Sequence, residues 1–292
     1  MTPELRWRGR LRLVGAGLLG LLGMLTAGAG AAAGQAIPLE NRPFDEQTLR
    51  PRGGAIVPIF DGWYRNADGS SNICFGYYSL NTEEEVDIPL GPANAVEPAE
   101  FDGGQPTHFD PAPETPYRRH YCVFTVTVPA DFGRRQQVVW TLERGDARAA
   151  TPGHLHPDYV LDEPESDGRG ESAPSLRFEE NGPRFRGRSG HTAAARTAAV
   201  GRPLELTVWA EHGGDRSWLG WTKHRGPGAV TFSAPEIWVE PAEGRATVAA
   251  TFDRPGDYLL RVQGIDDPVE DFEFHCCWTN GFVPVTVTGA AR

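Results

Sequence analysis

Short runs of β-branched and aromatic residues, separated by Gly, Pro and Asp, dominate the last third of the sequence. Many of these runs alternate apolar and polar positions, as expected for strands whose successive side chains point to opposite faces. The runs lie at 204–210, 221–232, 246–252, 256–263 and 281–288. This pattern is typical of an antiparallel β-sandwich.

Runs of the same kind cover the chain between residues 56 and 155. They predict strands at 56–60, 71–79, 86–90, 121–128, 137–143 and 147–155. Asp68-Gly69 is a hairpin signal before the second run, and the Pro- and Gly-rich residues 91–119 are predicted to form a long loop. We therefore predict a first all-β module of unassigned type over residues 37–165.

The composition changes sharply between residues 162 and 200. An acidic stretch at 162–168 and a basic, Gly-rich stretch at 185–190 are typical of linkers and mobile loops. Residues 175–178 could begin the next sandwich, whereas the Ala-rich residues 193–200 are too few and uncapped for a stable helix. The sequence thus predicts an all-β protein with two β-sandwich domains in tandem. Their linker is predicted at 166–173 and the second domain at 174–289.

The first 36 residues have the three parts of a secretory signal peptide. Four Arg precede residue 13, an apolar run follows to about residue 25, and small residues continue to Ala36. The alternative is an uncleaved membrane anchor, but the run is short and Gly-rich for a span of roughly 20 apolar residues. We expect cleavage within the small residues and an extracytoplasmic location, periplasmic or secreted.

The charge of the chain argues against one class of partner. The formal net charge is −11 and becomes −14 once the +3 segment 1–36 is removed. A surface this acidic repels a phosphate backbone, which argues against nucleic acid. No second apolar stretch reaches membrane-spanning length. The 35 Gly and 25 Pro are as expected for a protein with many turns.

Four cysteines in an exported chain favour disulfides over free thiols. Cys74 and Cys122 lie in two predicted strands of the first module, and a bond between them would close a loop of ~50 residues, worth on the order of 3–4 kcal/mol. The alternative is two buried thiols that pack as small apolar groups.

Cys276 and Cys277 are adjacent in the sequence. Successive strand side chains point apart, so these two could bond to each other only in a strained turn. Such a bond is more easily reduced than an ordinary one, which admits a redox role. Two unpaired thiols, or one of them bonded to Cys74 or Cys122, are the alternatives.

Two sets of residues could hold a metal ion. His154 and His156 would share one strand face, and with His275 and the two neighbouring thiols they could form a soft Cu or Zn site. Surface or hydrogen-bonded histidines are the favoured interpretation. Four acidic residues crowd one loop and could hold Ca²⁺, although a solvated acidic loop is favoured. They are Asp266, Asp267, Glu270 and Asp271. We accordingly predict no cofactor.

Catalytic motifs are absent from the sequence. It contains no Gly-x-Ser-x-Gly, His-Glu-x-x-His, Walker or Rossmann glycine motif. The predicted binding residues are aromatic: Trp278 beside the adjacent cysteines, with Trp63, Tyr77 and Tyr78 as a second group. Core packing is the favoured alternative for these rings. A hydrolase with its site in the 91–119 loop is a weaker option.

From residue 201 onward the pattern resembles the PKD family of immunoglobulin-like domains. The matching stretches are 200–206, a Trp-containing strand running into 226–230, 246–252, 255–262 and 283–287. By analogy with immunoglobulin-like sandwiches, Trp221 is expected to point inward. Tyr258 is expected at a corner where its hydroxyl reaches the backbone. The longer stretch 264–280 departs from the family pattern.

The PKD resemblance implies adhesion, spacing or binding rather than catalysis. The whole chain also resembles a type of exported bacterial protein in which a β module precedes such a domain, a likeness that implies no known activity. We therefore predict a non-catalytic exported module that binds a protein or glycan surface or serves in an envelope assembly. The alternative is a metal-binding or redox-active periplasmic protein that uses His154, His156, His275 and the adjacent cysteines.

Overall fold

The computed structural model describes residues 49–113, 119–162, 172–267 and 277–289, which belong to one compact unit, Thr48–Arg292. These residues form β-strands and turns, with two short 3₁₀ helices, η2 (Ala99–Phe101) and η3 (Pro157–Tyr159), and no α-helix. Nothing helical in this part of the chain is long and apolar enough to cross a bilayer. The all-β prediction is confirmed. The signal segment predicted at 1–36 lies outside the described residues.

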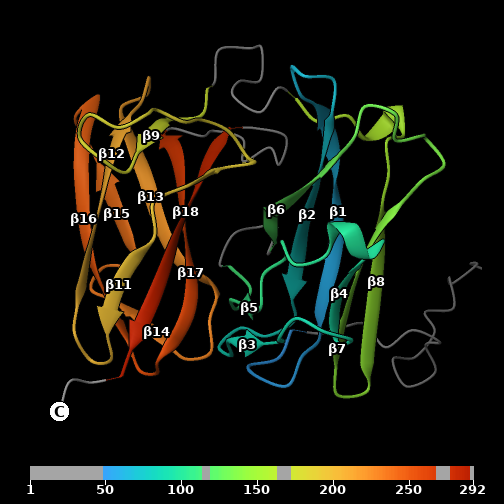
Figure 1. Cartoon of the computed structure of the whole chain (residues 1–292), viewed down its shortest axis with the longest axis horizontal. Coiled ribbons are helices and arrows are strands. Elements are labelled where there is room, and N and C mark those ends of the chain that lie inside the picture. Colours follow the sequence, from blue (N-terminus) through green and yellow to red (C-terminus); the bar gives the residue numbers. More distant parts are fainter. Residues whose placement is uncertain (1–48, 114–118, 163–171, 268–276, 290–292) are drawn as a thin grey trace, which may run out of the picture. The chain divides into compact units, whose positions relative to one another are not determined.

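The first sandwich is built from the strands between residues 56 and 153 (Figure 1). One sheet has the order β1–β2–β6 and the other β4–β7–β8, with a separate β3–β5 pair. Phe75, Phe124 and Trp140, which come from both sheets, are buried and pack ring against ring in one core. The strands are β1 (Ile56–Arg65), β2 (Ser71–Ser79), β3 (Val86–Asp87), β4 (Asn94–Glu97), β5 (His108–Phe109), β6 (His120–Val128), β7 (Val138–Arg144) and β8 (Ala147–Gly153).

The second sandwich contains the remaining strands and a separate core (Figure 1). One sheet has the order β10–β18–β17–β13–β15, with β11 also pairing with β18, and the other has the order β14–β16–β12–β9. The strands are β9 (Ser175–Arg177), β10 (His191–Thr192), β11 (Arg196–Ala199), β12 (Leu204–Glu211), β13 (Arg216–Arg225), β14 (Val230–Phe232), β15 (Glu236–Val239), β16 (Glu243–Phe252), β17 (Gly256–Asp267) and β18 (Trp278–Thr288).

Two aromatic residues of the second sandwich lie where the sequence predicts them. Trp221 on β13 points into the core. The Tyr258 hydroxyl donates to the carbonyl of Arg254 at 2.9 Å. The Tyr258 ring packs on Gly226, which has φ +151° and where a Cβ would come within 2.0 Å of the ring. The expected corner is therefore confirmed, and it depends on a glycine that leaves room for the ring.

Two irregularities in the β1–β2–β6 sheet bring Asp61 against Cys122. The β1–β2 register shifts at Asp61, and the β2–β6 register shifts opposite Gly76. Cys122 has φ 39°, in the left-handed region, and its N–H donates to Asp61 Oδ2 at 2.7 Å. A Cβ on Gly76 would lie 2.5 Å from the same carboxylate. The bulges thus aim a buried carboxylate at the backbone of β6.

The prediction of one long loop over 91–119 is wrong in part. β4, η2 and β5 lie within it. Asn94 on β4 is fully buried, and its side-chain amide donates to the carbonyls of Ile88 and Pro106. A buried polar side chain therefore holds this segment, which apolar periodicity does not reveal. The strands β11 and β15 were not predicted either.

The two sandwiches are joined by contacts between named residues. Lys223 on β13 forms an ion pair with Asp87 on β3, with Nζ and Oδ1 3.1 Å apart. The Asn280 side chain on β18 donates to the carbonyl of Cys122 on β6 at 3.3 Å. The linker predicted at 166–173 falls almost wholly outside the described residues, and the domain boundaries stay predictions.

Candidate functional site

The outer face of the larger sheet of the second sandwich carries a row of large side chains. In the strand register, Trp238 faces Trp218, Trp218 faces Ile265, and Ile265 faces Trp278. Facing residues on adjacent strands point to the same side of a sheet. The four side chains therefore form one band across β15, β13, β17 and β18.

A glycine and two polar groups hold this band in place. The Trp218 ring lies over Gly220, where a Cβ would come within 2.1 Å of the indole. The Trp218 Nε1–H donates to Glu236 Oε2 at 3.3 Å. The Arg216 guanidinium lies 3.8 Å from the centroid of the Trp238 ring, within the range of a cation–π contact. The indole of Trp218 is thus held against the sheet.

A cavity of about 660 Å³ lies against this band, and we call it the aromatic cleft. Its volume is within the range of roughly 300–1,000 Å³ that small-molecule sites occupy. The second sandwich contributes Trp218, Gly220, Trp221, Thr222, Pro235, Glu236, Trp238, Arg261, Gln263, Ile265, Asp266 and Trp278, and the first contributes Asp110, Pro113, Arg119, His120 and Tyr121. The lining thus combines five tryptophan and tyrosine residues with five charged residues.

Arg261 on β17 is the deeply buried cation of the aromatic cleft. Only 8% of its surface is exposed, and its Nε–H donates to Asn280 Oδ1 at 3.0 Å. Its Nη2 is buried and has no hydrogen-bond partner among the described residues. Burial lowers the pKa of Arg261 to about 10, so the guanidinium is still charged at neutral pH.

The Cys74–Cys122 disulfide packs behind one wall of the aromatic cleft. The bonded cysteines have their Cα atoms 5.0 Å apart and are buried in one cluster with Trp278. Ile265, the register neighbour of Trp278, packs against the same cluster. The disulfide therefore supports the end of the aromatic band, and the predicted Cys74–Cys122 pairing is confirmed.

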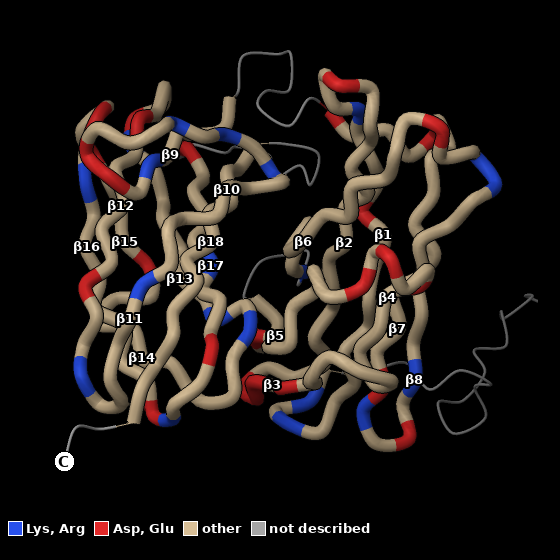
Figure 2. Tube along the Cα trace, in the orientation of Figure 1, with Lys and Arg blue, Asp and Glu red and all other residues tan. Residues whose placement is uncertain are grey.

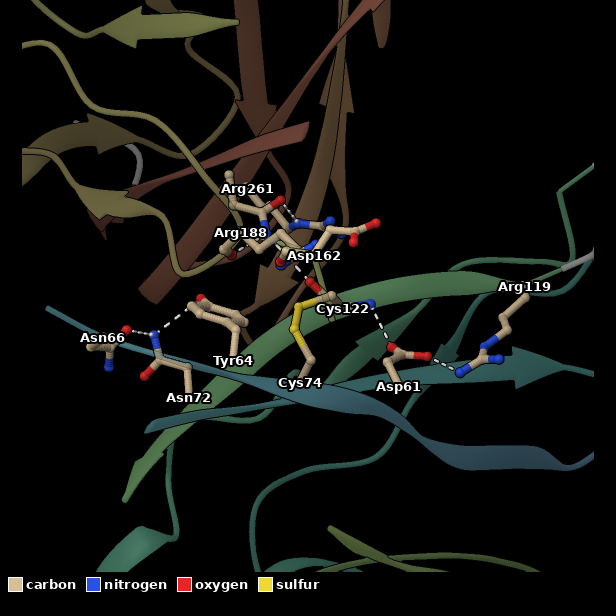
Figure 3. Close-up of a disulfide and its surroundings, with 11 residues drawn as sticks. Asp61, Tyr64, Asn66, Asn72, Cys74, Arg119, Cys122, Asp162, Arg188 and Arg261 are labelled. Atoms are coloured by element: carbon tan, nitrogen blue, oxygen red, sulfur yellow. Dashed lines mark hydrogen bonds and ion pairs between the residues drawn. A yellow bond between two sulfur atoms is a disulfide. The ribbon is translucent and has the colours of Figure 1, made fainter. Parts of the chain in front are cut away.

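Asp61 links this disulfide to a second cation of the cleft. Figure 3 shows its carboxylate between Cys122 and Arg119, accepting the Cys122 N–H and forming an ion pair with the guanidinium. The Arg119 guanidinium also lies over the Tyr121 ring, 4.7 Å from its centroid. Burial lowers the pKa of Arg119 to about 10. Arg119 is therefore a paired and fixed cation, unlike Arg261.

Acidic and imidazole groups meet where β5 and β6 reach the cleft. Burial alone would raise the pKa of Asp110, but the hydrogen bond and charge of His108 hold it below its ordinary value. Burial lowers the pKa of His120, whose Nε2–H donates to the carbonyl of Pro111 at 2.8 Å. The His120 ring stacks on Tyr77 with centroids 4.5 Å apart. His120 is thus neutral and engaged on both its ring face and its Nε2.

The second predicted pair of cysteines is only partly described. Cys277 is buried and disulfide-bonded. Cys276 lies outside the described residues, so the proposed bond between the two adjacent cysteines stays a prediction.

The predicted metal ligands do not assemble in the described part of the chain. His154 and His156 have ring centroids 6.1 Å apart, and His154 packs against Phe60 and Tyr159. Among the described residues no three His, Cys, Asp or Glu side chains are placed to hold a metal ion. His275 lies outside these residues, and the Cu or Zn hypothesis stays a prediction.

The predicted calcium ligands are divided in the same way. Glu270 and Asp271 lie outside the described residues, and Asp267 is the last residue of β17. The Asp266 carboxylate lines the aromatic cleft and accepts the Gly213 N–H at 3.2 Å. Burial raises the pKa of Asp266. Calcium binding here stays a prediction.

The predicted aromatic binding residues have different surroundings. Trp278 is buried but lines the aromatic cleft. Tyr77 is buried in the first core, where its hydroxyl accepts the Asp110 N–H at 2.9 Å. Trp63 is half-buried and its Nε1–H donates to the His156 carbonyl at 2.8 Å. Tyr78 has its ring beneath Arg119, 5.6 Å from the guanidinium.

Sequence reasoning missed most of the cleft. Trp218, Trp238 and Arg261 were not singled out, although strand periodicity carries a signal for two of them. Leu219 and Trp221 are the inward positions of β13, which places Trp218 on the outer face. Arg261 alternates in the same way with Leu260 on β17.

Comparison with known proteins gives limited information. No protein-family model and no curated protein matches the chain. Among solved structures, the ASH/PapD-like domain 7 of human CEP192 is similar at 14% identity and TM-score 0.27, covering 40% of this chain and 87% of that domain. The D00-D0 domain of intimin is similar at 11% identity and TM-score 0.24, covering 80% and 100%.

Domains 1–6 of the surface layer protein SbsC are similar at 10% identity and TM-score 0.26, covering 82% of this chain and 28% of theirs. Scores this low support no functional inference, and the PKD resemblance stays a prediction.

Proposed function

We propose that this chain is a non-catalytic, extracytoplasmic binding module whose ligand site is the aromatic cleft. The observation that carries the proposal is the band of Trp238, Trp218, Ile265 and Trp278, in register on the outer face of a sheet and lining a cavity of about 660 Å³. Ligand sites are commonly apolar, aromatic cavities with a few fixed polar groups. The aromatic cleft likewise combines aromatic rings with polar groups that neighbouring residues fix.

The polar groups of the cleft suit recognition because neighbouring groups hold them. Arg119 is paired with Asp61, and the His120 Nε2–H is used by the carbonyl of Pro111. Glu236 accepts the indole N–H of Trp218. Groups fixed in this way lose little conformational freedom when a ligand binds.

The extracytoplasmic location is supported by the buried Cys74–Cys122 disulfide. Such bonds form and persist in oxidising compartments and are rare in the cytosol. A partner met in the periplasm or outside the cell, either a glycan or a protein, follows from this location. The flat indoles favour a glycan, because aromatic side chains pack well against flat apolar surfaces.

Binding to a panel of oligosaccharides and peptides, with and without truncation of the cleft, tests the proposal. Trp218→Ala/Trp238→Ala is expected to weaken binding of the best ligand at least about tenfold. Trp209→Ala is the matched control, because Trp209 is a partly exposed tryptophan on β12 in the opposite sheet. A ligand that binds both variants equally well would place the site elsewhere and contradict the proposal.

A further inference from the structure

Arg261 differs from the other buried cations near the cleft. Lys223 has Asp87 at 3.1 Å, and Arg119 has Asp61 as its ion-pair partner. No carboxylate of the described residues forms an ion pair with Arg261. Burial lowers the pKa of Arg261 and the charge of Asp110 opposes this effect, but the hydrogen bond of Asp110 goes to His108. A buried charge without a hydrogen-bonded counter-ion is costly, so an anion from outside the chain would be stabilised at Arg261.

The neighbours of Arg261 leave hydrogen-bonding capacity unused. Asn280 takes its Nε–H, while Nη2 has no acceptor among the described residues. The indole Nε1–H of Trp278, which also lines the cleft, has no acceptor among them either. Two buried donors on adjacent strands β17 and β18 are therefore unsatisfied, which is rare in native structures. Trp278 faces Ile265 in the register, four residues along β17 from Arg261, so an extended ligand with acceptors at separate points matches this arrangement.

A carboxylate fits better than a neutral acceptor. A guanidinium binds carboxylate oxygens through two parallel hydrogen bonds, and charged hydrogen bonds are about twice as strong as neutral ones. Acidic and basic residues are interspersed over both sandwiches (Figure 2). Three carboxylates also line the cleft, but each already has a partner: His108 for Asp110, the Trp218 indole for Glu236 and the Gly213 N–H for Asp266. Arg261 is the lining cation whose Nη2 is left without an acceptor among the described residues.

The rest of the cleft favours a saccharide over a peptide as the carrier of this carboxylate. Its main wall is the face of β13, which is hydrogen-bonded on both sides to β15 and β17, so this central strand offers no free backbone edge to a peptide. The indole of Trp218 offers a flat apolar surface, and Glu236 and Gln263 stand next to it as acceptors for hydroxyl groups. A sugar ring, with apolar faces and hydroxyls at its edge, matches these surfaces.

We propose that the aromatic cleft binds a carboxylated saccharide, with the carboxylate against Arg261 and a sugar ring on the indole of Trp218. Ile265, the register neighbour of Trp218, is four residues from Arg261 on β17, or about 13 Å along the strand. An oligosaccharide rather than a single sugar spans this distance. The inference rests on the proposed function of the cleft and adds the chemical class of its ligand.

The test compares two matched probes, α-1,4-trigalacturonate and α-1,4-trigalactose, which differ in a carboxylate against a hydroxymethyl group on each ring. Calorimetric titration of the full chain is expected to give at least about tenfold tighter binding of trigalacturonate. Arg261→Met is expected to abolish this preference. Trp209→Ala is expected to keep the preference for trigalacturonate. Thermal melting of each variant tests whether the variant is folded.

The wild-type comparison alone decides the inference if Arg261→Met does not fold. Equal binding of the two probes, weakened by Trp218→Ala/Trp238→Ala, would overturn the carboxylate assignment and leave the binding function standing. A triglutamate peptide that competes as well as trigalacturonate would overturn the saccharide assignment. No binding of trigalacturonate contradicts the inference, whereas cleft truncations that leave the affinity of every ligand unchanged contradict the proposed function itself.

Discussion

At the residue scale, His108 on β5 shows how a buried charge is kept. Burial by itself would lower the pKa of His108, but hydrogen bonds to Asp110 and Asp87 raise it to about 9. The ring Nδ1 lies 2.8 Å from Asp87 Oδ1, and Nε2 faces Glu85 and Asp110 at 3.7 and 3.6 Å. Lys223, which pairs with Asp87, opposes the effect. The ring is charged at neutral pH.

This pKa has a defined consequence for stability. A folded-state pKa raised from 6.5 to about 9 gives a contribution that is complete below pH 6.5 and is lost as pH rises through 9. Its size is on the order of 3 kcal/mol. We expect His108→Gln to be less stable than the wild type at pH 6 and the difference to shrink by pH 10. Urea unfolding of both proteins at pH 6 and pH 10 measures this difference in the free energy of unfolding. A difference of the same size at both pH values would contradict the expectation.

Some single residues of the site could be predicted from the sequence and others could not. Cys74 and Cys122 were paired correctly because two apolar strands carry them. Alternation on the strands places Trp218 and Arg261 outward. Alternation does not show which outward-facing side chains are covered by another part of the chain. It therefore could not identify Trp218 and Arg261 as cleft residues. The carboxylate of Asp61 gave no signal, since its burial results from two bulges.

At the element scale, β6 combines a disulfide with a strained backbone. Cys122 has φ 39°, a conformation that favours glycine. Removing the disulfide is expected to cost about 3–4 kcal/mol. We expect Cys74→Ala/Cys122→Gly to be more stable than Cys74→Ala/Cys122→Ala by about 1 kcal/mol, since only glycine adopts this φ freely. Denaturant unfolding of the two variants compares them, and equal stability would show that residue 122 relaxes once the bond is absent.

Strand prediction succeeded where apolar runs were long and failed where polar contacts define the strand. The runs behind β2, β6, β12 and β16 were predicted close to their observed bounds. β4 and β5 were missed because they are four and two residues long, and β4 is held by the amide of Asn94. Short strands fixed by a buried polar side chain have no periodic signature.

At the scale of the whole molecule, the contacts between the sandwiches predict cooperative unfolding. Asp61 accepts the N–H of Cys122 within the first sandwich. The carbonyl of Cys122 in turn accepts a hydrogen bond from the side chain of Asn280 in the second sandwich. We expect Asp61→Ala to lower the free energy of unfolding by roughly 3–5 kcal/mol. Because the two cores are expected to unfold together, core amides of both β2 and β12 should lose protection against hydrogen exchange.

Hydrogen exchange by mass spectrometry measures this loss in each sandwich separately. Asp131→Ala is the control, because Asp131 is exposed and such changes are usually within about 0.5 kcal/mol. A loss confined to amides of the first sandwich would show that the two sandwiches unfold independently.

The presence of two sandwiches could be predicted from the order of strands along the chain. The cleft could not, because its walls come from segments more than 100 residues apart, such as Tyr121 and Trp238. Loop closure and side-chain packing determine which segments meet, and no local pattern records this.

The most direct test of the aromatic cleft is to fill it. Thr222 on β13 is the register partner of Arg261 and lines the cavity. Thr222→Trp would place a large ring where the ligand is expected. We predict at least about tenfold weaker binding of trigalacturonate by this variant, with the affinity of Trp209→Ala unchanged. An unaltered affinity in folded Thr222→Trp protein would contradict the assignment of the cleft as the binding site.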